Sequence, residues 1–298
     1  MKTFAVVGGD LRYIELAESL SARFCVYAMG FDKNVFTQKG ERKAKLLGSV
    51  TLNENRVDYL ILPIPAAKDE LHVNTGYFSG DIPMSSLPAL INESGTVFAG
   101  RLSETHKKMF EDAGISVVDY SNREDFAVMN AVATSEGAIQ IAMEETKTTI
   151  SSQKILILGM GRIAKVLLMH LRGFTDDITA AARKPHDIVW AGIFGKTGIS
   201  LAEAYKNIGE FDLIFNTIPT EILTSNRLSQ VKESAAIIDL ASKPGGVDFE
   251  AAEHLGIKAI HALSLPGKVA PITAGKVIAK TIENILIERG EGAGEERY

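Results

Sequence analysis

The sequence has a single cysteine, Cys25, among its 298 residues. One cysteine cannot form an intramolecular disulfide, and it excludes the paired-cysteine spacing of zinc sites and of CxxC redox motifs. Cys25 lies in the apolar run 24–28, which is typical of a buried strand. We therefore expect it to be a core residue.

Long hydrophobic runs and strong charge of one sign are also missing. No stretch reaches 18 consecutive apolar residues, so the sequence predicts no membrane-spanning helix. The first residues, MKTFAVVGGD, lack the pattern of a signal peptide. The net charge is -5, and the sequence has no block of like charge. It therefore has no basic segment of the kind that binds nucleic acid or an anionic membrane. We expect a cytoplasmic protein that binds neither.

Histidine is scarce, with six residues in the chain. None of them forms H-E-x-x-H or another metal-ligand spacing, so no metal site is predicted. His170 lies inside a predicted helix, where we expect a structural role. The sequence also lacks G-x-S-x-G and a P-loop, which leaves a hydrolase or kinase function without support.

The sequence does contain a repeated alternation of short apolar runs and amphipathic stretches. This pattern indicates parallel sheets covered by helices on both faces. The strands are expected at 4–7, 25–29, 57–62, 96–99, 115–118, 154–158, 177–182, 211–217, 235–240 and 258–262. The predicted fold class is α/β, with two Rossmann-like domains, a cleft between them and long linking helices.

Two long helical patterns divide this alternation into domains. We expect an N-terminal substrate or catalytic domain at 1–122 and a linking helix at 123–149. An NADP-binding Rossmann domain is expected at 150–270. The last segment, 271–298, should form a helix that returns toward the first domain and ends in a flexible tail. The cleft between the domains is the expected active site.

A dinucleotide-binding motif follows the strand 154–158. Gly159 permits a tight turn, Gly161 lets the backbone approach a pyrophosphate, and Ala164 allows close packing of helix on strand. The N-terminus of the following helix supplies N–H groups for the phosphates. The alternative is a purely structural glycine turn. The predicted cofactor contacts here also include Met160, Arg162 and Ile163.

The choice of cofactor is indicated at the end of the next strand, where NAD-dependent domains usually carry Asp or Glu. Here Ala182 is followed by Arg183 and Lys184. The planar guanidinium of Arg183 suits a 2′-phosphate, so we predict NADP. The alternative is that both cations are merely solvated loop charges.

The strand 211–217 ends in a segment that should run along the nicotinamide side of the cofactor. Its candidate contacts are Asn216, Thr217, Ile218 and Pro219. In this segment Asn216 and Thr217 could equally be ordinary strand-end turn residues.

Three further segments carry candidate substrate residues. Lys243, with backbone N–H groups freed by Gly245 and Gly246, would make an anion site. Ser264 and Leu265 follow the next strand, with Leu265 as a cofactor contact. In the linking helix, Asn130 and Thr134 share one face and Glu136 lies nearby. For each segment the alternative is loop chemistry or helix capping.

The first domain offers a strand-to-helix turn at 8–10 that is not a dinucleotide fingerprint. Arg12 follows this turn and could hold a carboxylate, while the sequence 63–65 gives a rigid strand exit at Pro65. Both are predicted to contact substrate.

These runs resemble the A-subunit family of dipicolinate synthase over nearly the whole chain. The resemblance is carried by residues 7–12, 62–65, 123–131, 134–139, 216–219, 239–249 and 264–271. It implies oxidation of dihydrodipicolinate to dipicolinate with NADP+ as hydride acceptor, in the lysine/diaminopimelate branch. It also implies a flavoprotein-like B subunit of dipicolinate synthase as partner, a homo- or hetero-oligomer, and expression in the mother cell of a sporulating bacterium.

That chemistry is compatible with the residues. A dicarboxylate substrate needs two anion sites, for which Arg12, Lys243 and the backbone at 245–246 are candidates. Aromatisation makes the reaction favourable, so the protein mainly has to position the ring and accept a proton. Either Glu136 or a water held by Ser264 could be the base.

Two alternative functions are considered, one enzymatic and one not. One is another NADP-dependent two-domain dehydrogenase of an oxo, imino or hydroxy acid, similar to alanine or shikimate dehydrogenase. A shikimate-type site would need a Lys–Asp pair, and Lys68 and Asp69 are adjacent in sequence, so they should point different ways. The other is a nucleotide-binding scaffold for the B subunit.

Overall fold

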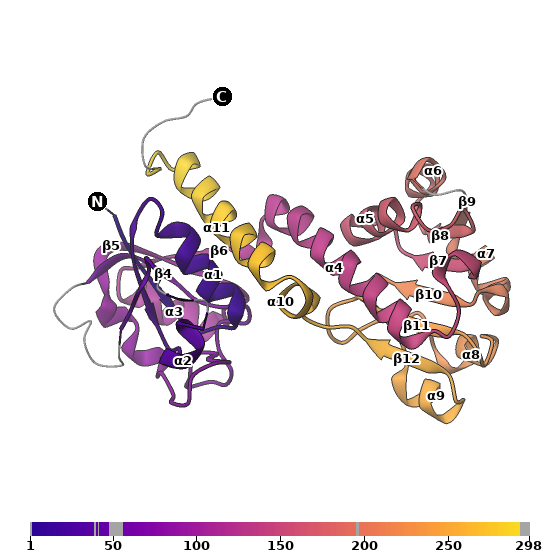
Figure 1. The fold of residues 1–298 in the computed structure, drawn as a ribbon, viewed down its shortest axis with the longest axis horizontal. Coiled ribbons are helices and arrows are strands. Elements are labelled where there is room, and N and C mark those ends of the chain that lie inside the picture. The colour runs from indigo at the N-terminus through magenta and orange to yellow at the C-terminus, as the bar shows by residue number, and fades with distance from the viewer. Residues whose placement is uncertain (1, 39, 41, 48–55, 195–196, 293–298) are drawn as a thin grey trace. The chain divides into compact units, whose positions relative to one another are not determined.

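The structure is a computed structural model that describes residues 2–38, 40, 42–47, 56–194 and 197–292. The chain forms two compact units. Unit 1 combines Met1–Ala127 with Ala270–Tyr298, and unit 2 is the continuous stretch Val128–Val269. Each unit holds a six-stranded parallel sheet with helices packed against it (Figure 1). The predicted α/β class with two Rossmann-like domains is therefore confirmed.

The sheet of unit 1 has the strand order β3-β2-β1-β4-β5-β6. Its strands are β1 (Thr3–Val7), β2 (Cys25–Met29), β3 (Lys45–Leu46), β4 (Val57–Ile61), β5 (Ile91–Ala99) and β6 (Ser116–Asp119). The helices are α1 (Leu11–Leu20), α2 (Lys33–Phe36), α3 (Glu104–Asp112), the first turn of α4 (Glu124–Glu145) and α11 (Pro271–Glu288). The order reverses direction between β1 and β4. In open sheets of this kind, ligands bind at the carboxyl ends of the strands that flank such a reversal.

The sheet of unit 2 repeats this topology, in the order β12-β11-β10-β7-β8-β9. Its strands are β7 (Ile155–Leu158), β8 (Ile178–Ala182), β9 (Thr197–Ser200), β10 (Leu213–Asn216), β11 (Ala236–Asp239) and β12 (Lys258–His261). Its helices are the rest of α4, α5 (Arg162–Leu171), α6 (Pro185–Phe194), α7 (Leu201–Lys206), α8 (Ser225–Leu228), α9 (Phe249–His254) and α10 (Leu265–Val269). The direction reverses between β7 and β10.

Burial on both faces explains why the strands are continuous apolar runs. Successive side chains of a strand point to opposite faces. Ile155 and Ile157 accordingly join one core cluster, and Leu156 and Leu158 join the other. Parallel strands covered by helices on both sides have no solvent face to occupy with polar residues.

Helix α11 packs closely on α1 within unit 1. A Cβ on Gly275 would lie 2.4 Å from the carbonyl oxygen of Arg12, so the two backbones meet where only glycine fits. Ile278 and Ile282 of α11 are buried in the same core cluster as Leu16 and Leu20 of α1.

Replacing Gly275 with alanine is expected to destabilise the protein by about 1–3 kcal/mol, because the added methyl group has to push two helices apart. Thermal unfolding of Gly275→Ala should show a Tm lower by several degrees. Thr273→Ala, on the exposed side of the same helix, is the matched control and should leave the Tm nearly unchanged. An equal Tm for the two variants would contradict this account of the helix contact.

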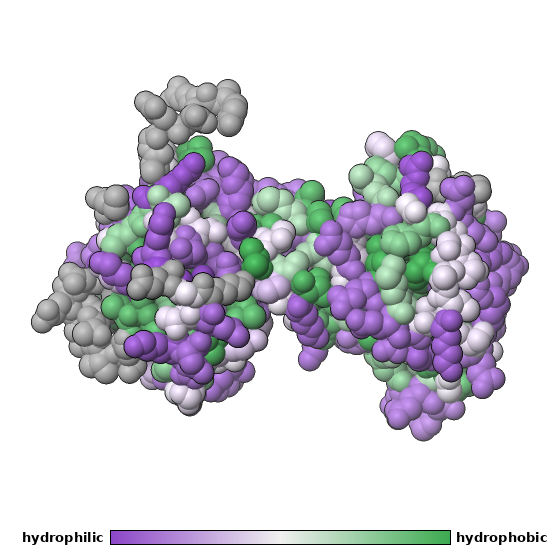
Figure 2. All heavy atoms as spheres, in the orientation of Figure 1, coloured by the Kyte–Doolittle hydropathy of each residue, from purple (hydrophilic) through white to green (hydrophobic). Residues whose placement is uncertain are grey.

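Helix α6 has an apolar outer face. Val189, Trp190 and Ile193 are exposed, and Figure 2 shows hydrophobic residues gathered over this helix. Trp190 is the only tryptophan of the chain, and the Lys165 ammonium lies 5.5 Å from the centroid of its ring. Because Lys165 belongs to the helix that follows the glycine turn, Trp190 provides a fluorescence probe on the same side of unit 2.

Several local expectations need correction. The sequence does not predict strand β9 or helix α6, and β5 begins at Ile91, well before the predicted residue 96. Cys25 is only half-buried, because it is the first residue of β2 and lies at the end of the core. The predicted flexible tail lies mostly outside the described residues. Among the helices in the described part of the chain, none is long and apolar enough to cross a membrane.

Candidate nucleotide and substrate sites

The glycine turn of unit 2 follows β7 at the point where the sheet reverses direction. Gly159 has φ +104°, a conformation that favours glycine. A Cβ there would lie 2.3 Å from Oγ1 of Thr217, and the N–H of Gly159 donates to the carbonyl of Ala181 at 2.8 Å. Gly159 is therefore required by the fold itself.

Gly161 differs, because no described residue fills the space beside it. It is the N-cap of α5, makes no side-chain cap, and a Cβ on it would meet no atom within 4 Å. Ala164 is fully buried, which holds the helix close to the sheet. The first N–H groups of a helix have no partner within the helix, so this open end suits a pyrophosphate. Met160 is buried, Ile163 is half-buried and Arg162 is exposed.

The predicted 2′-phosphate residues lie directly after β8. Ala182 is buried, whereas the side chains of Arg183 and Lys184 are exposed, and neither makes an ion pair with another described residue. The carbonyl of Lys184 accepts from the N–H groups of Asp187 and Ile188 at 3.0 and 3.1 Å. The backbone is thus fixed by the start of α6 while both cationic side chains are available to a ligand.

Asn216, at the end of β10, does not have a free side chain. It is fully buried, and its Nδ2 donates to the carbonyl of Ile218 at 3.0 Å and to Oδ1 of Asp239 at 2.8 Å. Its Oδ1 accepts from the N–H of Ile218 at 3.1 Å. The amide thus joins β10 to β11, and a cofactor contact of Asn216 stays a prediction.

The rest of this segment is partly open. Thr217 donates its hydroxyl to the carbonyl of Leu158 at 2.9 Å, which ties it to the glycine turn. Ile218 is half-buried and Pro219 is exposed. All three remain predicted cofactor contacts.

The predicted backbone anion site at 245–246 also needs correction. The N–H of Gly245 donates to the carbonyl of Ser242 at 3.0 Å, and the N–H of Gly246 donates to Oδ2 of Asp239 at 2.7 Å. Both groups are therefore used within the chain. Lys243 is exposed and precedes a cis peptide bond to Pro244.

The candidates on α4 divide between buried and exposed positions. Thr134 donates its hydroxyl to the carbonyl of Asn130 at 2.9 Å and is buried. Asn130 is half-buried and Glu136 is exposed. The neighbouring Ser135 is fully buried and its Oγ lies 2.8 Å from Nδ1 of His170, the histidine predicted to be structural.

Ser264 and Leu265 lie at the start of α10. Ser264 is exposed and has φ +60°, an uncommon conformation for a residue other than glycine. The side chain of Leu265 is buried in the core of unit 2, close to Gly137 of α4. This side chain joins α10 to α4, and a cofactor contact of Leu265 stays a prediction.

Arg12 of unit 1 lies at the carboxyl end of β1 and is held by Asp10. Nε donates to both carboxylate oxygens, at 2.8 and 3.1 Å, and Nη2 donates to Oδ2 at 2.8 Å. Burial acts to lower the pKa of Arg12, but the hydrogen bonds to Asp10 outweigh it and the pKa is raised. The guanidinium is thus charged and fixed in orientation. Among the described residues, its Nη1 has no hydrogen-bond partner.

A tyrosine pair beside Arg12 was not expected from the sequence. The hydroxyls of Tyr13 and Tyr120 are 2.7 Å apart, and Tyr120 donates to the carbonyl of Leu62 at 3.0 Å. Burial raises the pKa of Tyr13 to about 12, so the pair stays protonated at neutral pH. The two residues are 107 positions apart, which is why no local pattern indicates the contact.

The next segment follows β4, the second of the two strands between which the strand order of unit 1 reverses direction. The Ile64–Pro65 bond is cis, Pro65 is exposed, and its carbonyl accepts from Nδ2 of Asn74 at 3.1 Å. Arg12 and Pro65 thus follow the two strands, β1 and β4, that flank the reversal.

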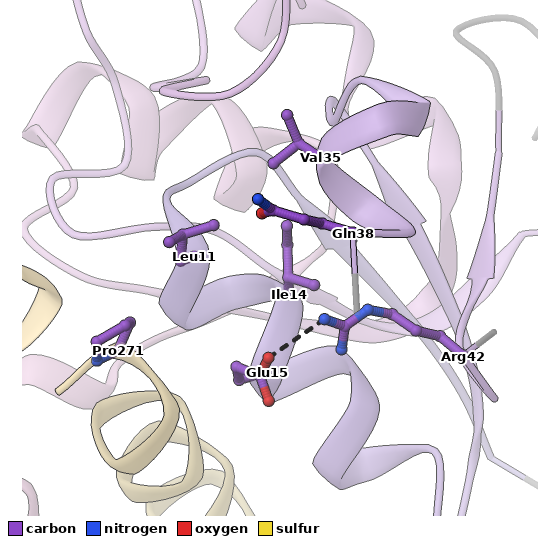
Figure 3. A pocket seen from close by; sticks show the side chains of 7 residues that line it. All are labelled: Leu11, Ile14, Glu15, Val35, Gln38, Arg42 and Pro271. Atoms are coloured by element: carbon purple, nitrogen blue, oxygen red, sulfur yellow. Dashed lines mark hydrogen bonds and ion pairs between the residues drawn. The ribbon is translucent and has the colours of Figure 1, made fainter. Parts of the chain in front are cut away.

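A small pocket between α1 and α2 is not a candidate for either ligand. Leu11, Val35 and Pro271 line it, and Glu15 pairs with Arg42 across it at 3.2 Å (Figure 3). Its volume is about 40 Å³, which has room for a few water molecules only.

Comparison with known proteins identifies the family. Residues 3–121 match the family model of the N-terminal domain of the dipicolinate synthase A subunit. The chain is 30% identical to the dipicolinate synthase A subunit of Bacillus subtilis (strain 168) over 290 residues, which is 95% of each protein. The chain belongs to the A-subunit family of dipicolinate synthase. The crystal structure of the family member from Bacillus halodurans is 27% identical and superposes with a TM-score of 0.85, covering 96% of this chain and 97% of that one.

The chain also shares its fold with dehydrogenases outside the family. An L-alanine dehydrogenase structure superposes with a TM-score of 0.63 at 13% identity, covering 97% of this chain and 90% of that one. At this identity the likeness concerns the fold alone. Among the described residues, no group of three or more His, Cys, Asp or Glu residues could hold a metal ion.

Proposed function

We propose that the protein is an NADP-dependent oxidoreductase that oxidises dihydrodipicolinate to dipicolinate, pyridine-2,6-dicarboxylate, during sporulation. The reaction acts on a CH–CH type ring bond. The observation that supports this most is the 30% identity to a dipicolinate synthase A subunit across 95% of both chains, which spans both units and all the candidate loops.

The residues at the reversal in unit 2 fit a nicotinamide dinucleotide. The open space beside Gly161 would take the pyrophosphate at the N-terminus of α5. Arg183 and Lys184 would hold the 2′-phosphate, because no carboxylate ends β8 and both cations lack an ion-pair partner among the described residues. When bound, the cofactor supplies the hydride acceptor.

The substrate is a dicarboxylate, so it needs two cationic partners. The candidates for carboxylate binding are Arg12, whose guanidinium is fixed by Asp10, and Lys243. Pro65, Asn130 and Thr134 stay proposed substrate residues, with Thr134 acting from its buried position through Asn130. Loss of one hydride and one proton yields the aromatic ring, and the proton goes to Glu136 or to a water held by Ser264.

The cofactor assignment is tested by Arg183→Ala. The variant is expected to lower kcat/KM for NADP+ about thirtyfold and to change kcat/KM for NAD+ less than about twofold, because only NADP+ carries the 2′-phosphate. Steady-state kinetics with both cofactors measure this. Arg172→Ala, an exposed residue at the other end of α5, is the control and should affect neither. Equal losses with the two cofactors would overturn the assignment of NADP.

The proposal includes the B subunit of dipicolinate synthase as partner, a cytoplasmic location in the mother cell and a place in the lysine/diaminopimelate branch. Rates of NADPH formation from dihydrodipicolinate, measured with and without the B subunit, distinguish an enzyme from a scaffold. NADPH formed by this chain alone would support catalysis by its own residues. If NADPH appears only with the B subunit, the scaffold or a shared site is favoured.

A further inference from the structure

Asp239 is a fully buried carboxylate at the end of β11. Its Oδ1 accepts from Nδ2 of Asn216 at 2.8 Å and from the N–H of Ala241 at 3.1 Å. Its Oδ2 accepts from the N–H of Gly246 at 2.7 Å. In the described part of the chain, no Lys, Arg or His side chain pairs with it. Burying a carboxylate costs free energy, and hydrogen bonds to its two oxygens offset that cost.

The donors show what this carboxylate organises. Ala241 and Gly246 are the two ends of one loop, so the carboxylate fixes the loop from inside. The fit is close, because a Cβ on Gly245 would lie 2.7 Å from Oδ2 of Asp239, and one on Gly246 would lie 2.1 Å from Nδ2 of Asn216.

A second contact supports the loop from the neighbouring strand. Nε2 of His261, at the end of β12, lies 3.0 Å from the carbonyl of Ala241. The imidazole of His261 stacks on the ring of Phe249 at a centroid distance of 5.2 Å. The first residue of the loop is thereby held on its carbonyl side by His261 and on its N–H side by Asp239.

Lys243 lies in the middle of this loop and is exposed, while the loop ends are buried. We infer that Asp239 is a positioning residue for Lys243: by fixing the loop 241–246 it presents the Lys243 ammonium to a substrate carboxylate. The inference rests on the proposed function, in which Lys243 binds one carboxylate of dihydrodipicolinate. A preorganised cation binds its anion without first having to order a loop.

A double-mutant cycle tests the inference, with Asp239→Asn and Lys243→Met as the single variants. An asparagine has roughly the same shape, but its amide cannot accept from three N–H donors on both sides. Each single variant is expected to lower kcat/KM for dihydrodipicolinate about thirtyfold, and the double variant should be no more than about twofold worse than either single one. The NADP+ dissociation constant, measured by Trp190 fluorescence, should change less than twofold in all three.

Independent effects would overturn the inference, since the double variant would then lose about nine hundredfold, the product of two thirtyfold losses. If Asp239→Asn does not fold, His261→Phe replaces it in the cycle. That variant keeps a ring to stack on Phe249 but loses the contact to Ala241, and its smaller loss should again be absent in the Lys243→Met background. A loss that persists there would overturn the inference.

A measurement without substrate separates this inference from the proposed function. Hydrogen exchange of the amides at 241–246 should be at least tenfold faster in Asp239→Asn than in the wild type, with exchange at 155–158 unchanged. Unchanged exchange at 241–246 contradicts the positioning role. Wild-type protein that does not oxidise dihydrodipicolinate, with or without the B subunit, contradicts the proposed function instead.

Discussion

Replacing Arg12 with lysine is expected to lower kcat/KM for dihydrodipicolinate about a hundredfold, equivalent to roughly 3 kcal/mol of transition-state binding. The guanidinium uses Nε and Nη2 for Asp10, and its third nitrogen, Nη1, has no hydrogen-bond partner among the described residues. A lysine ammonium is a single point charge and cannot hold Asp10 and a substrate carboxylate in the same fixed geometry. Steady-state kinetics and the Tm of the variant measure the effect.

The matched control is Arg23→Lys. Arg23 lies just beyond the end of the same helix, its side chain is 62% exposed and it reaches Glu283 only at 4.0 Å, so its replacement should change neither kcat/KM nor the Tm. The NADP+ dissociation constant of Arg12→Lys should stay within twofold of the wild type, because Arg12 and the glycine turn belong to different units. A variant with normal kcat/KM for dihydrodipicolinate would exclude Arg12 as a substrate residue.

Replacing Gly161 with alanine is expected to raise the NADP+ dissociation constant about thirtyfold, roughly 2 kcal/mol, without lowering the Tm. In the part of the chain that the structure describes, the space beside Gly161 is open, and an added methyl group meets no atom within 4 Å. A bound pyrophosphate would need that space, because it has to approach the backbone closely. Titration followed by Trp190 fluorescence or calorimetry measures the affinity.

Gly192 on α6 provides the control, because a Cβ there also meets nothing within 4 Å. Gly192→Ala should leave the dissociation constant unchanged and can raise stability slightly, since alanine favours a helix over glycine by up to about 1 kcal/mol. Tight NADP+ binding by Gly161→Ala would place the pyrophosphate elsewhere.

The strands could be predicted from the sequence because they are buried on both faces. The run Ile155–Leu158 is apolar at every position, and such runs are visible without knowing the fold. Strand β9 has no such run: it begins with an exposed residue, its other residues are half-buried, and it contains Gly198. The edge strands β6 and β12 show the same partial burial, but each has two adjacent apolar residues, whereas β9 has only Ile199, between a glycine and a serine.

The candidate sites could be predicted only where the determining contacts are local. The glycine turn and the two cations after β8 could be located from the sequence, because each directly follows an apolar strand run. Asn216 and Gly246 are residue types that are common in ligand-binding loops. In the structure, however, the amide of Asn216 and the N–H of Gly246 donate hydrogen bonds to Asp239. Which partner a strand-end polar group takes depends on the strand beside it, and strand order is not visible in a local pattern.

The division of unit 1 into two stretches has a consequence for synthesis. Helix α11 supplies Ile278, Ile282 and Leu286 to the core of unit 1. The ribosome makes the whole of unit 2 before it makes α11. Unit 2 is continuous and can close its core as soon as it emerges. Until α11 is made, the first 127 residues lack the helix that covers the apolar face of α1, so the core of unit 1 can close only at the end of synthesis.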